Sequence, residues 1–213
     1  MVKKVKKTEK LKRVALLELN EAYTKVLYWF FSFPNIETGL NDLTSNLNIS
    51  KTTANKAVGK LIKEGFLNKK EYGKAWRITC NFNHHYNTST KITFNLAMVY
   101  EAYYKDLRDR ILTVVGNAKS VILFGNYRKG DDNEQSDIDI GVEVNDNKDV
   151  KIFELGIIPT FGFRDNVLVN IHIFSRNNID INLFSNIANG IVLEGYLEVK
   201  PSWGIRFLIA KTP

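Results

Sequence analysis

Cysteine, methionine, histidine and proline are all scarce in this chain of 213 residues. It contains one cysteine, two methionines, three histidines and four prolines. A single cysteine cannot form an intramolecular disulfide, so we expect a reducing, cytoplasmic setting. Cys80 with His84 and His85 would offer too few ligands, at unsuitable spacings, for a structural zinc site. The scarcity therefore excludes disulfide-stapled and zinc-nucleated folds.

Long apolar runs are also absent. The longest apolar patch, Val26 to Phe33, is far too short to span a bilayer. Residues 1–14 are rich in lysine but are followed by no apolar stretch of the kind a signal peptide contains, so we interpret them as a basic tail. Hydrophobic residues make up 44% of the chain, which is enough to build packed cores. We expect no membrane association.

Positive charge is concentrated in the first part of the chain. Residues 1–80 carry 16 Lys and Arg against 7 Asp and Glu, whereas residues 81–213 carry 14 against 16. A solubilising tail would explain only the first of two basic clusters, because residues 51–80 also hold eight basic side chains against two acidic ones. This distribution predicts that the first part of the chain binds a polyanion.

Residues 15–82 have the pattern of a small helical domain that ends in a hairpin. Apolar residues recur at helical spacing, Ser50 is a suitable N-cap, and Gly65 is suited to end a helix. We expect helices over residues 24–33, from Leu40 to Leu47 and after Ser50, then a β-hairpin over residues 67–71 and 75–80.

The segments Ile49–Val58 and Leu61–Leu67 resemble the recognition helix and the start of the wing in winged helix-turn-helix proteins. The resemblance implies binding to double-stranded DNA, with many such proteins being transcription regulators. Base edges would be read by the first turns of the helix, through Lys51, Thr52, Thr53 and Asn55. Phosphates would be held by Lys56, Lys60, Lys69, Lys70 and Lys74. One alternative stays open, namely a small helical protein-interaction domain with a solvated charged face. Within the DNA-binding interpretation, a homodimer would read two half-sites, although nothing in the sequence demands one.

The most informative stretch of the second part is Leu123 to Val144. An apolar run ends in Gly125, a polar loop follows, and Asp137 and Asp139 then alternate with isoleucines and a valine. On a strand the two aspartates would lie on one face, while the apolar residues would point into a core. Two carboxylates on one face of a buried strand are costly without a cation, so we expect a divalent metal carrying nucleotide phosphates.

Gly125-Asn126, ten further residues and then Asp137-Ile138-Asp139 resemble the signature of the polymerase-β-like nucleotidyltransferase superfamily, above all its minimal nucleotidyltransferases. The resemblance implies transfer of a nucleoside monophosphate from ATP or another nucleoside triphosphate, with Mg²⁺ held by the two aspartates as metal-binding and catalytic residues. The implied nucleotide-binding residues are Gly125, Asn126, Arg128, Lys129, Gly130 and Ser136. Asn126 replaces the usual serine, and Arg128-Lys129 replace a small residue and an arginine.

The superfamily has a third carboxylate on a neighbouring strand, and here that position falls on Asn170 within the expected strand 167–175. An amide is a weaker Mg²⁺ ligand than a carboxylate and cannot act as a base. His172 lies on the same face and is either a base or a hydrogen-bonded neighbour of the site. Ile187–Gly195 resembles the end of minimal nucleotidyltransferase domains. We also expect a helix over residues 94–115, a helix over 177–188 and a strand over 191–197, while residues 146–163 show no clear pattern.

The predicted fold is α+β, with a winged helix-turn-helix over residues 15–82, a linker and connecting helix over 83–115, and a small nucleotidyltransferase-fold α/β domain over 116–213. We interpret the chain as a DNA-binding protein whose second domain binds a metal–nucleotide, as a nucleotide-responsive transcription regulator would. The alternative is an active Mg²⁺-dependent nucleotidyltransferase that modifies a hydroxyl of a protein or a small molecule. A protein-interaction scaffold is a third, weaker interpretation.

Overall fold

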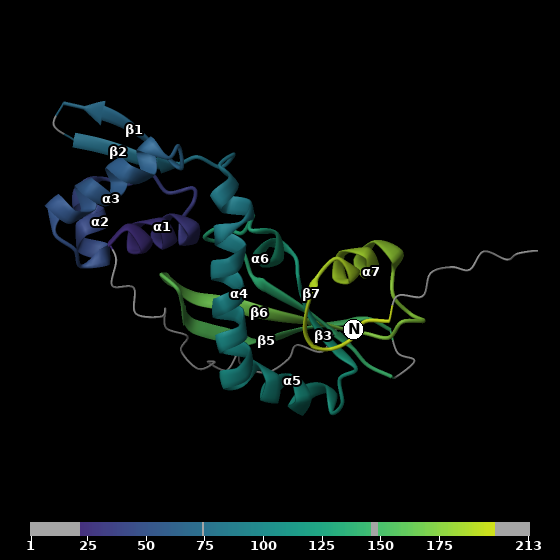
Figure 1. Ribbon diagram of the computed structural model, residues 1–213. Helices are drawn as coiled ribbons and strands as arrows, with labels where there is room; N and C mark the ends of the chain where they lie inside the picture. Colours follow the sequence, from purple (N-terminus) through teal and green to yellow (C-terminus); the bar gives the residue numbers. More distant parts are fainter. Residues whose placement is uncertain (1–21, 74, 146–148, 199–213) are drawn as a thin grey trace, which may run out of the picture.

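The computed structural model describes residues 22–73, 75–145 and 149–198 (Figure 1). It contains an N-terminal unit of helices and a hairpin, a five-stranded sheet, and a long helical segment between them. The predicted basic tail, Lys74 and residues 199–213 of the predicted second domain lie outside the described residues. None of the helices in the described ranges combines the length and the apolarity needed to cross a membrane.

The elements of the N-terminal unit lie close to their predicted positions. They are helices α1 (Ala22–Ser32), α2 (Leu40–Leu47) and α3 (Lys51–Lys63) and strands β1 (Leu67–Tyr72) and β2 (Ala75–Cys80). The Ser50 side chain accepts a hydrogen bond from the backbone N–H of Thr53 at 3.1 Å, which confirms the predicted N-cap of α3. Thr38 pairs with Ile78, so the segment before α2 joins the edge of the hairpin.

The segment expected to be a linker is folded. It contains the 3₁₀-helix η1 (His85–Thr88), and the buried Asn87 side chain donates hydrogen bonds to the backbone oxygens of Asn81, Phe82 and His84. These bonds satisfy backbone groups that a solvated linker would leave to water. The predicted long helix follows as α4 (Thr90–Ala102), the π-helical turn η2 (Tyr103–Leu107) and α5 (Arg108–Val115).

The sheet of the second part has the strand order β5-β6-β4-β3-β7. Its strands are β3 (Ser120–Phe124), β4 (Ile138–Glu143), β5 (Lys151–Phe161), β6 (Arg164–Phe174) and β7 (Ile191–Gly195), and its short helices are α6 (Asn126–Lys129) and α7 (Ile181–Ala188). Strands β4 and β6 are parallel, and the other paired strands are antiparallel. β5 falls in the stretch that the sequence left unassigned.

Side chains alternate between two cores on opposite faces of the sheet. Ile138 and Ile140 are fully buried, as the alternation predicts, in the main core that α4 covers. That core also includes α1 and α3, so it runs through both parts of the molecule. On the other face Ile122 and Phe174 form a smaller core with Ile187 of α7. The charged and polar side chains of the predicted site lie on this second face.

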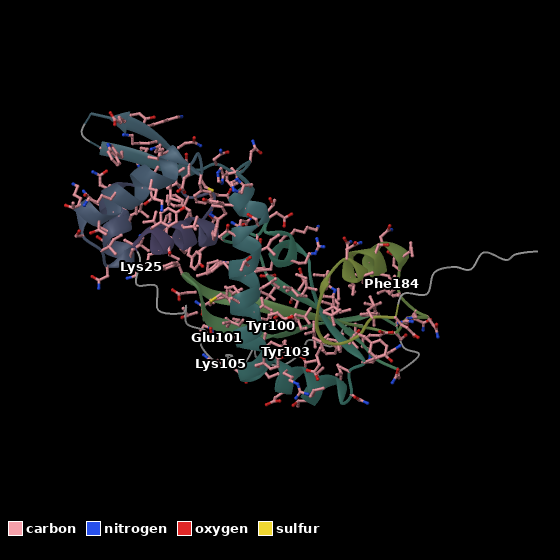
Figure 2. All side chains as sticks on the ribbon, viewed as in Figure 1. Lys25, Tyr100, Glu101, Tyr103, Lys105 and Phe184 are labelled. Carbon is pink, nitrogen blue, oxygen red and sulfur yellow. The ribbon has the colours of Figure 1, made fainter. Side chains whose placement is uncertain are left out.

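Tyrosines of the long helical segment, labelled in Figure 2, fasten it to the edge strand β7. Tyr103 donates a hydrogen bond to Glu194 at 2.6 Å, and Arg108 donates two to the same carboxylate at 2.7 and 2.9 Å. Tyr100 donates to the backbone oxygen of Val192 at 3.3 Å. These contacts set the position of the sheet against the helix that leads back to the N-terminal unit.

Candidate functional site

Two glycines shape the turn that precedes the aspartates. Gly125 has φ +74°, and a Cβ there would lie 2.8 Å from Oδ2 of Asp139. Gly130 has φ +80°, and a Cβ there would lie 2.1 Å from the backbone oxygen of Asn87. Only glycine tolerates both constraints. Gly125 therefore brings backbone against a carboxylate of the site, whereas Gly130 packs the turn against residues 83–89, the folded segment before α4 that is here called the connector.

The two aspartates meet Asn170 and His172 on one face of the sheet. The Asn170 amide donates to Oδ2 of Asp137 at 3.3 Å, and Nε2 of His172 lies 3.2 Å from Oδ1 of Asp139. These contacts arise because β4 and β6 run parallel, with Asp139 paired to Asn170. The structure thus gathers four residues that the sequence singled out, from two strands far apart in the chain.

His172 orients Asp139. Its ring packs edge-on against Phe124 with a centroid separation of 4.9 Å, and its Nδ1 is buried without a hydrogen-bond partner among the described residues. Because a carboxylate oxygen only accepts hydrogen bonds, the contact with Asp139 requires the hydrogen on Nε2, which then donates. His172 is accordingly a hydrogen-bond donor to the carboxylate in this structure.

The remaining residues of the predicted nucleotide site differ in exposure: those on α6 are accessible, whereas Ser136 is buried. Tyr127 buries its ring and so anchors the one-turn helix α6, which leaves Asn126 and Lys129 exposed and Arg128 half-buried. The Arg128 and Lys129 side chains make no hydrogen bond or ion pair with another described residue, so both cations are available. Ser136 is buried, and its hydroxyl accepts a hydrogen bond from the N–H of Asn133 at 3.0 Å. Ser136 therefore shapes the loop.

A loop over residues 131–136, here called the aspartate loop, leads directly into Asp137 and is braced by buried charges. Arg164, at the start of β6, donates to the backbone oxygens of Glu134 and Ser136, both at 2.9 Å, and to the Tyr127 hydroxyl. Asp132 accepts from the Asn95 amide at 2.7 Å and lies 3.4 Å from the ammonium of Lys91. α4 and β6 thus fix the backbone next to the first aspartate.

Burial dominates the titration of these bracing groups. Loss of solvent raises the pKa of Asp132 and lowers that of Lys91, and the opposite charge of each partner counteracts the effect on the other. Loss of solvent also raises the pKa of the Tyr127 hydroxyl, which the nearby Arg164 guanidinium opposes. Buried charges of this kind require partners, so they make the loop depend on its packing against α4.

Sequence reasoning missed Glu154 and the bracing residues. Glu154 of β5 pairs with Asn170, which pairs with Asp139, so the three lie in one row across adjacent strands. Directly opposed residues share a face, and the neighbours Phe153 and Leu155 pack against the main core, so Glu154 points to the aspartate side. Its side chain is exposed and makes no hydrogen bond or ion pair with another described residue. A β-bulge between Glu154 and Gly156 interrupts the alternation that would have revealed it.

The donor set fits a divalent cation that arrives with phosphates attached. Among residues 22–73, 75–145 and 149–198, no three His, Cys, Asp or Glu side chains are grouped to hold a metal. The site instead offers two carboxylates, and Gly125 leaves the space that a Cβ would fill beside one of them. Mg²⁺ is commonly held by one or two carboxylates with substrate phosphates and water completing its octahedron. Asp137 and Asp139 would be the protein ligands.

The N-terminal unit presents a second polar surface. Of the residues predicted to contact DNA, those exposed are Lys51, Thr52, Thr53, Asn55, Lys56, Lys60 and Lys70. Three of the predicted residues already have partners inside the unit. Thr53 belongs to the N-cap of α3, the Lys60 ammonium lies 4.2 Å from the Tyr23 ring centre, and the Lys69 ammonium lies 4.0 Å from the Trp76 ring and 2.6 Å from Glu71.

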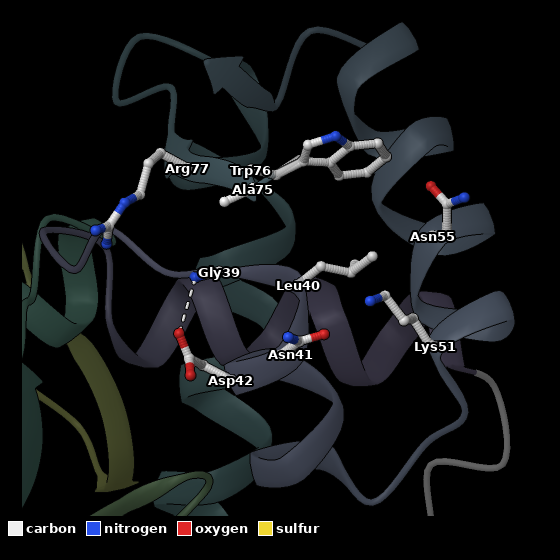
Figure 3. A pocket seen from close by; sticks show the side chains of 9 residues that line it. All are labelled: Gly39, Leu40, Asn41, Asp42, Lys51, Asn55, Ala75, Trp76 and Arg77. Atoms are coloured by element: carbon white, nitrogen blue, oxygen red, sulfur yellow. Dashed lines mark hydrogen bonds between the residues drawn. The ribbon is translucent and has the colours of Figure 1, made fainter. Parts of the chain in front are cut away.

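A cleft of about 610 Å³ separates α3 from strand β2 (Figure 3). Lys51 and Asn55 line it from α3, and Trp76 and Arg77 from β2, while the first turn of α2 forms its floor. Asp42 accepts a hydrogen bond from the backbone N–H of Gly39 at 3.2 Å and so caps that turn. The cleft is open and flanked by two basic side chains.

A family comparison and a comparison with curated proteins bear on this arrangement. No curated protein matches the chain. Residues 105–181 match the nucleotidyltransferase domain family. The matched range includes both glycines of the turn, both aspartates and Asn170, and it ends at the start of α7. The mixed α+β chain thus contains a nucleotidyltransferase domain, built on the strands that carry the aspartate face.

Proposed function

We propose that the nucleotidyltransferase domain binds a nucleoside triphosphate together with Mg²⁺, and that Asp137 and Asp139 hold the metal. The observation that carries this proposal is the convergence of the two carboxylates beside Gly125, within a range that matches the family. Arg128 and Lys129 are available cations on the adjoining helix and would neutralise phosphate charge. ATP is the first nucleotide to test.

Binding of a fluorescent ATP analogue, with and without Mg²⁺, tests the proposal. We expect saturable, Mg²⁺-dependent binding that weakens about tenfold or more in Asp137→Asn and Asp139→Asn, since each loses a charged ligand. Asp109→Asn is the matched control, because the Asp109 side chain is 86% exposed in the same domain. Metal-independent binding, or equal binding by all variants, would exclude the aspartates as the metal site.

For the N-terminal unit we propose a winged helix-turn-helix that binds double-stranded DNA, which would make the protein a nucleotide-responsive transcription regulator. The support is the order of three helices and a hairpin, the exposed lysines of α3, and the cleft between α3 and β2. Binding of such lysines to phosphates releases counterions, so the affinity should fall steeply with salt. Dimerisation remains part of this proposal, because a dimer would read two half-sites.

Fluorescence anisotropy with duplex DNA at two salt concentrations tests DNA binding. Lys51→Ala with Lys56→Ala should reduce both the affinity and its salt dependence, by about one unit of the salt slope for each phosphate that is no longer neutralised. Lys105→Ala serves as the control, because Lys105 lies on the long helical segment, away from this surface. Affinity that does not change with salt would contradict the proposal and favour a protein-binding role.

One observation favours an active nucleotidyltransferase as a second candidate. Transfer to a hydroxyl of a protein or a small molecule needs a base, and Asn170 cannot supply one. Glu154 presents an exposed carboxylate one strand further along the same row. It would accept the proton of the attacking hydroxyl, while the two aspartates hold the metal that neutralises phosphate charge.

Label transfer from α-labelled ATP, with and without cell extract, separates the two candidates. Transfer that is abolished in Asp137→Ala and in Glu154→Gln, but kept in the exposed control Glu71→Gln, would establish an enzyme and exclude a pure nucleotide sensor. Metal-dependent nucleotide binding without transfer would support the sensor. Because the amide of Glu154→Gln keeps the side-chain length, its effect would report the missing base.

A further inference from the structure

In the described part of the chain, four side chains from outside the aspartate loop hold it, and one of them belongs to the N-terminal unit. Three of them come from the other part of the molecule: Arg164 lies on β6, and Lys91 and Asn95 lie on α4. The fourth is Asn35, in the segment between α1 and α2. Its backbone N–H donates to Oε1 of Glu134 at 2.8 Å, and its side-chain amide donates to Oε2 at 2.9 Å. Both oxygens of one carboxylate are therefore bound by one residue that lies 99 positions earlier in the chain.

This contact is linked to Asp137, a proposed metal ligand, through Glu134 and Arg164. The guanidinium nitrogen of Arg164 that donates to the backbone oxygen of Glu134 also donates to that of Ser136, the residue before Asp137. A displacement of Glu134 must therefore change the bonding that fixes the backbone beside the aspartate. Hydrogen bonds to a charged group are stronger than neutral ones, which lets Asn35 hold the loop although it is exposed.

The junction around this contact is only partly packed. A cleft of about 470 Å³ lies between Trp29 and Phe33 of the N-terminal unit and Phe163 in the turn before Arg164. The continuous core around Phe94 joins the two parts elsewhere, but beside this cleft the segment that contains Asn35 has less apolar packing. On this side of the junction, the two hydrogen bonds of Asn35 therefore do more to place the aspartate loop.

We propose that Asn35 is a positioning residue of the aspartate site, acting through Glu134, and that it couples the N-terminal unit to metal–nucleotide binding. This inference rests on the proposed function of the site. Coupling is reciprocal, so a ligand that shifts the aspartate loop also shifts the segment between α1 and α2, and a partner of the N-terminal unit changes nucleotide affinity by the same factor. The nucleotide state of one part is thereby communicated to the other.

A charge exchange tests the pair. Asn35→Asp sets a second carboxylate against Glu134 and should weaken binding of Mn²⁺, and of ATP with Mg²⁺, about tenfold, as outer-shell changes at metal sites do. Asn35→Asp combined with Glu134→Gln restores a carboxylate–amide pair with the roles reversed and should recover the affinity. Asn83→Asp adds the same charge at an exposed position of the connector and should leave affinity unchanged.

Electron paramagnetic resonance of free Mn²⁺ and fluorescence of an ATP analogue supply the affinities, and circular dichroism verifies folding. If the double variant recovers the affinity, general destabilisation cannot explain the weak binding of Asn35→Asp, because the double variant still carries that substitution. If Asp137→Asn abolishes binding while Asn35→Asp binds like the wild type, the aspartate site stands and the coupling fails. If the wild-type protein binds neither probe, the proposed function itself fails, and the coupling with it.

Discussion

Asn170 decides the character of the aspartate site at the scale of a single residue. Its amide donates to Asp137 at 3.3 Å where the superfamily pattern implies a third carboxylate. Asn170→Asp should tighten Mn²⁺ binding about tenfold, because a charged oxygen ligand replaces a neutral one. Without metal the same change should lower the melting temperature, since two carboxylates would then face each other. Metal titration and thermal melts of one variant measure both effects.

An unchanged Mn²⁺ affinity in Asn170→Asp would contradict this prediction. If Asn170→Asp leaves Mn²⁺ affinity unchanged while Asp139→Asn abolishes it, the position of Asn170 lies outside the metal's ligand shell. Asn182→Asp, exposed at the start of α7, provides the same charge change away from the aspartates.

Gly59 has no structural role that the fold reveals. It is exposed in the middle of α3, and beyond its own turn of the helix a Cβ there would meet no atom of a described residue within 4 Å. Glycine in a helix interior costs about 1 kcal/mol relative to alanine. Gly59→Ala should therefore stabilise the protein by about 0.5–1 kcal/mol, measured by urea denaturation. Unchanged or lower stability would show that this position does not behave as an ordinary exposed helix site.

The sequence predicted individual residues well where the reason was local. The N-cap Ser50 and the burial of Ile138 and Ile140 follow from short-range rules. It could not predict that Lys91 would be buried against Asp132. That outcome depends on α4 crossing the loop, which no local pattern contains.

At the scale of elements, Glu194 fastens β7 to the helical segment. Hydrogen bonds from Arg108, and then from Tyr103, lower the pKa of Glu194 from its usual value of 4.5. Because the folded-state pKa lies below the unfolded one, the stability from this contact is present above pH 4.5 and disappears as the pH falls through the folded pKa. Glu194→Gln should therefore lower the melting temperature at neutral pH, with the difference closing in acid.

Melts of both proteins over a pH series test this sign. Glu101→Gln is the control, because Glu101 forms an exposed i,i+4 pair with Lys105 on the same helical segment, and such pairs contribute about 0.3–0.5 kcal/mol. A Glu194→Gln difference that persists unchanged into acid would show that packing around β7, and not the carboxylate, makes the contact.

Elements were predictable when their hydrophobic period was uninterrupted. The long helix after the connector and strand β6 were expected from spacing, and both are present. β5 was not, because its bulge shifts the alternation, and Pro159 and Gly156 within it resemble loop residues. A parallel β4–β6 pair with β5 at the edge is a long-range arrangement. For that reason the row that joins Asp139, Asn170 and Glu154 could not be read from the sequence.

At the scale of the whole molecule, one continuous core predicts one cooperative unfolding transition. The main core contains Val26 and Phe31 from the N-terminal unit together with Val121 and Ile171 from the sheet. Phe94 of α4 lies between the two parts. Its ring is 4.5 Å from that of Tyr28, measured between centroids. Calorimetry of the wild-type protein should give equal calorimetric and van't Hoff enthalpies, the sign of a two-state transition.

Phe94→Ala should weaken that connection selectively. A Cβ at Gly162, in the turn between β5 and β6, would lie 2.8 Å from the Phe94 ring, so the ring also contacts the sheet. Removing the ring should cost about 3–5 kcal/mol and split the calorimetric transition, because the N-terminal unit and the sheet would then unfold separately. Phe184→Ala is the control, since Phe184 packs against the smaller core on the other face, and it should lower stability while keeping a single transition. A single transition in Phe94→Ala would mean that the polar contacts of the aspartate loop, with Asn35 among them, suffice to hold the two parts in one cooperative unit.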